Sequence, residues 1–196
     1  MKNLVKQFLV AAVLLTTVVT TAMNDDPSVK INSVSAKLVN LTLNNFDKAI
    51  KFSIKDNEGL VLYSETFEKE VFSKKFNLAT LPVGNYYFEI DSYTKIKTIP
   101  VYVDAVKVIL NENNSTVYFK PMVRLSNNTV LISKLSLNNA PLKVVMYDQN
   151  FNVIYMDEIS GSKNLEKKLD VSELPQGTYN LLLSSENKTV LETFTK

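Results

Sequence analysis

The stretch Leu81-Pro82-Val83-Gly84-Asn85-Tyr86 occurs a second time in this chain, as Leu174-Pro175-Gln176-Gly177-Thr178-Tyr179. In each copy the proline presets the backbone φ angle, and the glycine stands where a type I turn closes. A strand with alternating apolar residues follows each turn at once. Its apolar positions are Tyr86, Phe88 and Ile90 in the first copy and Tyr179, Leu181 and Leu183 in the second. We therefore expect two units, each built around a proline–glycine corner.

The repeat extends well beyond the corner. Upstream of it, Ile50, Phe52 and Ile54 recur as Leu142, Val144 and Met146 at a spacing of 92 residues (142 − 50). The corner recurs at a spacing of 93 residues (175 − 82). Leu43-Asn44-Asn45 is echoed by Leu137-Asn138-Asn139. So many aligned positions indicate a duplicated module, with two tandem globular domains rather than a solenoid.

Short alternating segments with turn signals every 8–12 residues predict an all-β chain. The pattern favours two tandem immunoglobulin-like antiparallel β-sandwich domains after an N-terminal signal peptide. Pro100 predicts an edge position for its strand, because proline cannot donate to a ladder. The expected boundaries are a signal peptide at 1–22, a flexible segment at 23–36, the first sandwich at 37–103, a connector at 104–115 and the second sandwich at 116–196.

Composition excludes several classes of function. The chain has 196 residues, with no histidine and no cysteine. It therefore lacks the usual general base near neutral pH, the thiol nucleophile and the commonest transition-metal ligands. With 22 basic and 20 acidic residues and Arg124 as the single arginine, no basic stripe for nucleic acid is visible.

The N-terminus indicates export. Lys2 and Lys6 precede the apolar run from Phe8 to Val19, and the small residues Thr20-Thr21-Ala22 follow. This is the pattern of a cleaved secretory signal peptide, with a retained anchor as the alternative. The apolar core is shorter than the ~20 residues that span a bilayer. We expect a secreted, periplasmic or cell-surface protein, without a membrane span after signal cleavage.

The run from Met146 to Lys196 resembles the C-terminal sorting domains of Bacteroidota proteins exported by the type IX secretion system. The matching features are the strand end Tyr147-Asp148, the hairpin return Val153-Ile154-Tyr155 and the segment Asp170–Tyr179. The corner also resembles secreted immunoglobulin-like modules of the same bacteria. The resemblance implies a small β-sandwich that the export machinery reads at the outer membrane. The terminal strand departs from the usual basic and apolar pattern, and a second copy of the corner lies inside the chain.

No residue constellation in the sequence points to chemistry. Asp56-Asn57-Glu58 is a candidate calcium loop, but it lacks the alternating ladder of oxygen ligands, and a solvated hairpin tip is the preferred interpretation. Acids such as Glu65, Glu68, Glu70, Asp157 and Glu158 are expected on solvent faces or loops. Ser73-Lys74 is treated as a chance adjacency. We predict no catalytic residue, no metal site and no cofactor, and hence no enzyme.

Two groups of tyrosines attract attention. Alternation assigns Tyr87, Tyr93, Tyr102 and Tyr147 to solvent faces, where tyrosine stacks on sugar rings, anchors a protein partner or pairs across strands. Tyr86 and Tyr179 are expected at a corner, with the ring buried and the hydroxyl bonded to nearby backbone.

These patterns predict an exported, non-catalytic tandem sandwich that serves as a structural, adhesive or accessory module of the cell envelope. Its expected partner is a protein or a glycan there. One alternative is a carbohydrate-binding module that uses the exposed tyrosines. The other is a type IX secretion cargo whose second domain is the sorting domain.

Overall fold

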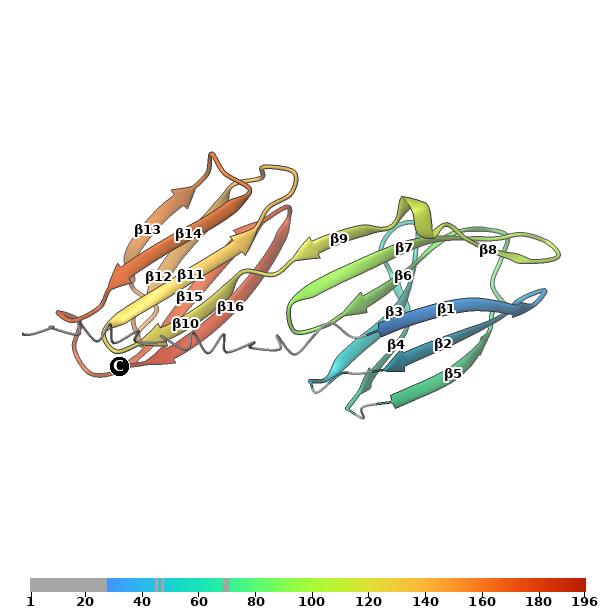
Figure 1. Ribbon diagram of the computed structural model, residues 1–196, viewed down its shortest axis with the longest axis horizontal. Coiled ribbons are helices and arrows are strands. Elements are labelled where there is room, and N and C mark those ends of the chain that lie inside the picture. Colours follow the sequence, from blue (N-terminus) through green and yellow to red (C-terminus); the bar gives the residue numbers. More distant parts are fainter. Residues whose placement is uncertain (1–27, 45, 47, 69–70) are drawn as a thin grey trace, which may run out of the picture.

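The computed structural model describes residues 28–44, 46, 48–68 and 71–196. The predicted signal peptide at 1–22 lies outside these residues. Within them, sixteen antiparallel strands and one short 3-10 helix form two units that lie end to end, with β9 (Thr116–Phe119) between them (Figure 1). The predicted all-β fold is confirmed.

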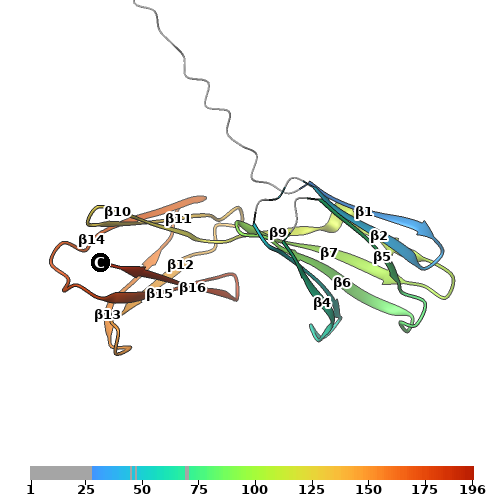
Figure 2. The same cartoon turned by 90° about the horizontal axis from the view of Figure 1, so that it is seen from below.

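The first unit has two facing sheets. In the view turned by 90°, they form two layers (Figure 2). The smaller sheet has the order β1 (Ser28–Ser35), β2 (Leu38–Asn44) and β5 (Val71–Asn77). The larger sheet has the order β4 (Val61–Phe67), β3 (Ile50–Asp56), β6 (Gly84–Asp91), β7 (Lys95–Val103) and β8 (Val108–Leu110), and β9 also pairs with β7.

The second unit repeats this arrangement strand by strand. Its smaller sheet has the order β10 (Met122–Ser126), β11 (Thr129–Leu135) and β14 (Asn164–Asp170). Its larger sheet has the order β13 (Val153–Ile159), β12 (Leu142–Tyr147), β15 (Thr178–Ser185) and β16 (Lys188–Thr195). In each unit the fourth strand in chain order joins the larger sheet and the fifth returns to the smaller one. The prediction of two tandem immunoglobulin-like sandwiches is therefore confirmed.

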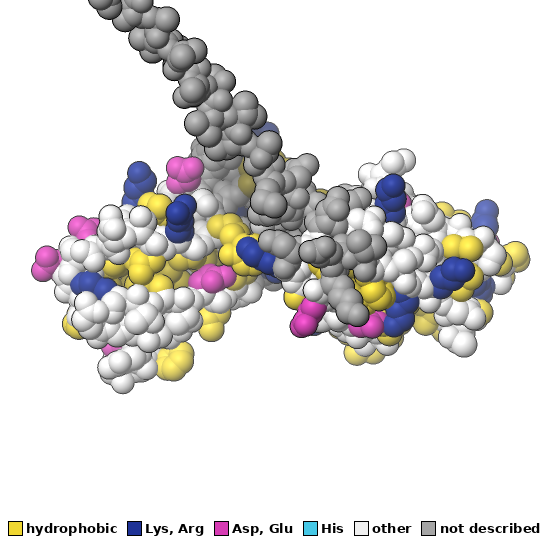
Figure 3. All heavy atoms as spheres, turned by 60° about the horizontal axis from the view of Figure 1, so that its bottom comes forward, with side chains coloured by type: hydrophobic (Ala, Val, Ile, Leu, Met, Phe, Trp, Pro, Cys, Tyr) yellow, Lys and Arg dark blue, Asp and Glu magenta, His cyan; other side chains and the backbone are white. Residues whose placement is uncertain are grey.

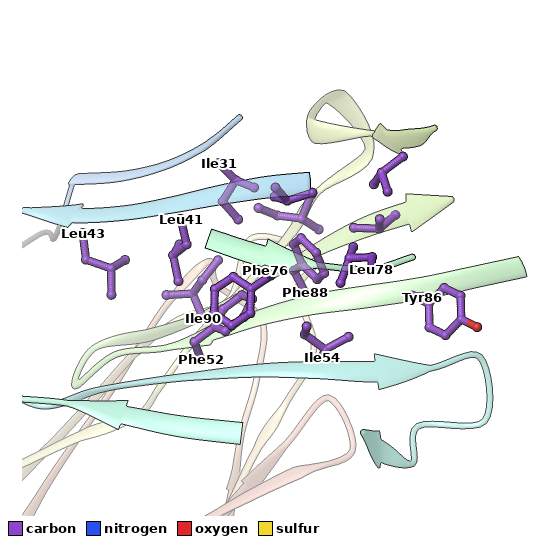
Figure 4. Close-up of a cluster of buried hydrophobic side chains, with 14 of the residues drawn as sticks. Ile31, Leu41, Leu43, Phe52, Ile54, Phe76, Leu78, Tyr86, Phe88 and Ile90 are labelled. Carbon is purple, nitrogen blue, oxygen red and sulfur yellow. The ribbon is translucent and has the colours of Figure 1, made fainter. Parts of the chain in front are cut away.

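The predicted alternation fills both interiors. In the first unit the ring centroids of Phe52 and Phe76, one from each sheet, lie 5.0 Å apart, and Phe88 lies 5.4 Å from Phe52 (Figure 4). Burying each of these side chains contributes about 1.5–3 kcal/mol to stability. A separate cluster of buried residues around Leu142, Leu181 and their neighbours fills the second unit.

Strand pairing corrects one detail of the repeat. Leu43 of β2 lies opposite Phe72 of β5, and in the second unit the same place in β11, opposite Leu165, is held by Lys134. The counterpart of Leu43 is therefore Lys134, and the correspondence with Leu137 drawn from the Leu-Asn-Asn echo is wrong. Identity of three consecutive residues thus predicted the corresponding position less well than the strand register does.

The turn before each corner also differs from its prediction. The hydrogen bond that closes a turn here runs from the Leu81 N–H to the Leu78 carbonyl, at 3.1 Å, so this turn ends at Leu81 instead of beginning there. The second unit has the same bond between Leu174 and Val171. Gly84 already belongs to β6, where it lies opposite Val103. The proline therefore follows the turn and leads into the strand.

The corner tyrosines link this segment to the core. The Tyr86 ring is buried, and its hydroxyl donates to the Pro82 carbonyl oxygen at 3.0 Å. Tyr179 makes the same bond to Pro175 at 2.8 Å. Each unit thus has a tyrosine corner, in which the ring fills the interior and the hydroxyl holds the incoming loop.

Segments outside the two predicted sandwiches add strands to them. Residues 28–35 were expected in a flexible lead, but they form β1, because Val29 and Ile31 alternate with polar neighbours and Ile31 is buried. The predicted connector contains β8 and the 3-10 helix Glu112–Asn114. β9, expected to open the second sandwich, pairs with β7 of the first.

The predicted edge position of Pro100 is wrong, since β7 has partners on both sides. The residue falls in the gap between β9, which reaches Thr98 of β7, and β8, which ends opposite Val101. Its missing N–H therefore interrupts neither ladder.

Candidate functional site

Two of the four candidate tyrosines share one surface. Tyr87 of β6 lies opposite Pro100 of β7, and Tyr102 lies two residues further along β7. Residues two apart on a strand point to the same face, so the two tyrosines are diagonal neighbours on the outer face of the larger sheet. Tyr102 is 40% exposed, whereas Tyr87 is half-buried. Nearby on this face, Lys55 donates to Glu89 Oε1 at 2.7 Å.

The other two tyrosines lie elsewhere. Tyr93 stands in the turn between β6 and β7 and is 50% exposed, with the Lys48 ammonium 3.4 Å from its ring centroid. Tyr147 lies at the end of β12 in the second unit and is half-buried. The four tyrosines therefore do not form one site, and Tyr87 and Tyr147 are less exposed than alternation predicted, because neighbouring strands flank them on both sides.

Tyr93 also lines a depression between the two units. The depression has a volume of about 480 Å³, and its other lining residues come from β10, β11 and β14 of the second unit, among them Arg124, Ser133 and Lys168. Glu166 carries a negative charge into the same wall. With Lys167, three cations and one acid line the depression, so its wall has a net positive charge.

A tyrosine–acid–lysine cluster that the sequence did not reveal closes one side of the first sandwich. Tyr63 and Glu65 lie on β4, an edge strand of the larger sheet, and Lys74 lies on β5, an edge strand of the smaller one. The Tyr63 hydroxyl donates to Glu65, while the Lys74 ammonium donates to Glu65 and, at 2.8 Å, to the Tyr63 oxygen. The cluster therefore joins the two sheets where no backbone ladder does.

The second unit contains the same cluster. The Tyr155 hydroxyl donates to Asp157 Oδ2 at 2.8 Å, and Lys167 donates to the same oxygen at 2.6 Å. Tyr155 and Asp157 lie 92 residues after their counterparts and Lys167 lies 93 after Lys74 (155 − 63, 157 − 65, 167 − 74). Glu65 and Asp157 were expected to face solvent alone, and Lys74 was treated as a chance neighbour of Ser73. Their partners lie on another strand, so local alternation did not predict these contacts.

The electrostatics of the clusters favour a structural role. The hydrogen bond from Lys167, followed by that from Tyr155, lowers the pKa of Asp157 to about 2. Its bond to Asp157 in turn raises the pKa of Lys167, and partial burial raises the pKa of Tyr155. Each shift makes the resting charge state more persistent at neutral pH. Groups that transfer protons in catalysis have pKa values near the working pH instead.

A second polar cluster lies where β9 meets the second unit. The Lys134 side chain has no solvent exposure, and its ammonium donates to the Phe119 carbonyl at 3.1 Å and to Glu186 Oε1 at 2.9 Å. It also lies 4.5 Å from the centroid of the Tyr118 ring, a cation–π contact. Burial, and then the negative charge of Glu186, raises the pKa of Tyr118. This cluster ties the strand that leaves the first unit to the interior of the second.

The candidate calcium loop is a closed hairpin. Asp56 Oδ1 accepts hydrogen bonds from the N–H groups of Glu58 and Leu60, both at 2.9 Å. Asp148 makes the equivalent bonds to Asn150 and Asn152.

Across the described ranges, no group of three or more His, Cys, Asp or Glu side chains is arranged to hold a metal ion. The helices in that part of the chain also include none with the length and apolarity to cross a bilayer.

The surface carries mixed charge. On the face shown in Figure 3, Lys and Arg side chains alternate with Asp and Glu, and hydrophobic side chains emerge between them on both units. No continuous basic or acidic area is visible on that face. This view contains none of the basic stripe that nucleic-acid binding uses.

Fold and local geometry thus define a tandem immunoglobulin-like β-sandwich protein. Residues 126–196 match the family described as the secretion system C-terminal sorting domain. This match covers β11 to β16 and confirms the resemblance found in the sequence. A sorting domain of this kind implies a secreted or cell-surface protein. A search of curated proteins finds no match.

Three solved structures share a weak overall similarity with the chain. A biofilm associated protein BSP domain is 15% identical, with a TM-score of 0.30, over 85% of this chain and 29% of that one. The FN1–FN3 domains of chicken CNTN1 are 11% identical, with a TM-score of 0.30, over 86% and 63%. The human OSCAR ligand-binding domain is 13% identical, with a TM-score of 0.25, over 87% and 97%. The chain spans less than two thirds of the first two.

Proposed function

We propose that this protein is an exported, non-catalytic component of the cell envelope whose second unit acts as a sorting domain of the type IX secretion system. The observation that carries the proposal is the family match over residues 126–196. The first unit has the same strand order and its own tyrosine corner but lies outside that match. We assign export to the second unit, and a structural, adhesive or accessory role to the first.

Truncation tests the sorting role. A chain that ends at Lys120 keeps the first unit with β9 in place and loses the whole second unit. In a host with this secretion system, we expect the full chain at the surface or in the medium and the truncated chain retained in the periplasm. Equal delivery of both chains would refute the assignment. A full chain with Tyr87→Ala is the matched control, because it leaves the second unit intact.

The two tyrosine–acid–lysine clusters support the non-catalytic part of the proposal. These groups of titratable side chains lie at equivalent places in both units, and their pKa shifts move away from neutrality. Their positions between edge strands of opposite sheets fit a stabilising role.

A second candidate role belongs to the first unit. Tyr87 and Tyr102 share a sheet face, which is the arrangement that stacks on a sugar ring in a carbohydrate-binding module. Binding of the full chain to a glycan array, lost in Tyr87→Ala and in Tyr102→Ala, would support this role. Tyr147→Ala in the other unit is the control that should leave binding unchanged. No glycan bound by the wild-type chain, or binding that survives both changes, would refute it.

A further inference from the structure

The two units differ at one sheet edge. In the first unit the outer side of β7 is covered, because β9 pairs with Lys95–Thr98 and β8 with Val101–Val103. The counterpart of β7 is β16, the last strand in the order β13-β12-β15-β16. No strand in the described part of the chain pairs with the outer side of β16. Its free N–H and carbonyl groups form a template for another strand, and β9 shows that the equivalent edge accepts one in antiparallel orientation.

The charges along this edge are arranged symmetrically. Lys188 and Glu192 lie two residues before and two residues after Val190, so all three side chains point to the same side of β16. Their neighbours in β15 are the buried Ser185, Leu183 and Leu181, which places this side toward the sandwich interior. In the first unit the position of Glu192 is held by Ile99, which is buried. The bare edge therefore has a charge where the covered edge has an apolar residue.

This arrangement is complementary to itself. If two copies of β16 pair antiparallel with Val190 opposite Val190, each Glu192 lies opposite the Lys188 of the other copy. Opposite charges at directly opposed positions stabilise a pair of strands, and like charges destabilise it. Shifting the register by two residues in one direction places Glu192 opposite Val190 and removes both ion pairs, and a shift of four residues places Glu192 opposite its own copy. The charges thus favour one register among the neighbouring ones.

The outer face of the same sheet supports this pairing. In the second unit a row of apolar side chains crosses all four strands and ends at Leu191 on the open edge. Met156 is 69% exposed and Leu191 is 58% exposed. In the register given above, Leu191 of one copy is a diagonal neighbour of Leu191 of the other, so the two rows become continuous. The row is Met156, Val145, Leu182 and Leu191, and its counterpart in the first unit is Ser64, Ser53, Glu89 and Thr98.

We propose that the open edge of β16 is a self-association surface, at which two copies of this chain pair antiparallel about Val190 into one continuous sheet. The contact is isologous, with the same strand on both sides of a two-fold axis. It combines main-chain hydrogen bonds, two Lys188–Glu192 ion pairs and the joined apolar rows. The first unit lacks such a contact because β8 and β9 occupy its edge.

Charge reversal in the full chain tests the proposal. Sedimentation velocity over a range of concentrations should show a dimer for the wild-type chain. We expect Glu192→Lys and Lys188→Glu each to raise the dissociation constant about tenfold or more, because each places like charges opposite one another. The double variant Lys188→Glu/Glu192→Lys should restore the wild-type value. Glu166→Lys, an exposed reversal on the edge strand β14 of the other sheet, is the control and should leave the dimer intact.

A cysteine variant tests the register without changing charge. The chain has no cysteine, so Val190→Cys introduces a single thiol. Directly opposed residues have Cα atoms about 4.5–5.5 Å apart, within reach of a disulfide. Oxidation should give a covalent dimer with Val190→Cys but not with Thr193→Cys. The proposal would be overturned if the wild-type chain stays monomeric or if its dimer is insensitive to both charge reversals. Binding of another protein at this edge, instead of a second copy, would overturn it as well. Circular dichroism of every variant separates loss of pairing from loss of fold.

Discussion

The ammonium group of Lys134 lies 2.9 Å from Glu186 Oε1, at the place in β11 where the first unit has the buried Leu43 in β2. One copy of the duplicated sandwich thus has an ion pair where the other has a leucine. Glu186 also accepts a hydrogen bond from the Asn138 side chain, and Lys134 also donates to the Phe119 carbonyl, so both members of the ion pair have a further partner. The interior of the second unit therefore differs from that of the first at the end that lies against the first unit.

Removing the acid from this pair should destabilise the second unit. Glu186→Ala leaves the buried Lys134 charge with only carbonyl oxygens and the Tyr118 ring as partners, which costs about 2–3 kcal/mol, at the lower limit of the range for buried pairs because Glu186 is partly exposed. Replacing both groups, as in Lys134→Leu/Glu186→Ala, should recover most of this loss, since the first unit accommodates leucine. Urea denaturation monitored by circular dichroism compares the variants. A double variant less stable than Glu186→Ala would contradict the interpretation.

The Asp157 cluster predicts sensitivity to acid. The folded-state pKa of Asp157 is about 2, below its ordinary value of 3.8, so the unfolded chain binds a proton more readily than the folded chain. The stabilisation is therefore complete above about pH 4 and is lost as the pH falls through 2. Urea midpoints measured between pH 2 and pH 5 should fall less steeply for Asp157→Asn than for the wild-type chain. Glu158→Gln, on an exposed pair with Lys143 at 3.8 Å, is the matched control and should follow the wild-type slope.

A strained residue at the second hairpin tip predicts a stabilising change. Phe151 has a φ angle of +61°, in the left-handed region, and is 71% exposed. Its counterpart is Gly59, with φ of +87° (151 − 59 = 92). Left-handed strain costs a bulky residue about 1–2 kcal/mol, and glycine loses about 0.5–1 kcal/mol in chain entropy. Phe151→Gly should therefore raise the free energy of unfolding by about 0.5–1 kcal/mol. Gly59→Phe should lower the free energy of unfolding. If that free energy falls in both variants, Phe151 makes a contact that stabilises the fold by more than its backbone strain costs.

The tyrosine corners should contribute equally in the two units. Tyr86→Phe and Tyr179→Phe each remove one hydroxyl-to-carbonyl bond and keep the buried ring. We expect each to cost about 1 kcal/mol, the usual net value of such a bond. Tyr102→Phe, at a tyrosine that is 40% exposed, serves as the control for loss of the oxygen atom. Thermal unfolding measures all three, and a loss at either corner no larger than that of the control would count against the bond.

Much of this fold was predictable from sequence, because alternation along a strand and the identity of corner residues are local properties. Val39, Leu41, Phe52 and Phe88 point inward as the period-two pattern requires, and the duplication was evident from two fixed spacings. The pairing of β9 with β7 was not predictable in this way. A strand of four residues can join either neighbour, and its choice depends on which sheet edge is free.

The polar clusters show the same limit. Lys74 lies nine residues after Glu65, on a strand of the opposite sheet, so no helical or strand periodicity brings them together. Alternation through Val130 and Ile132 places Lys134 on the inward face, but lysine is rarely fully buried, so the pattern alone did not predict its burial. Comparison of the two copies position by position, in the correct register, would have placed Lys134 on Leu43. That register follows from strand pairing, and the amino-acid sequence alone did not reveal it.

The double attachment of β9 determines how tension passes along the molecule. Four residue pairs hold β9 side by side with β7, and the carbonyl of Phe119, the last residue of β9, accepts a hydrogen bond from the buried ammonium of Lys134. A force that separates the ends of the chain loads these pairs in shear, so they must yield together instead of opening one at a time. The link between the two sandwiches is consequently a mechanical clamp that resists extension along the chain.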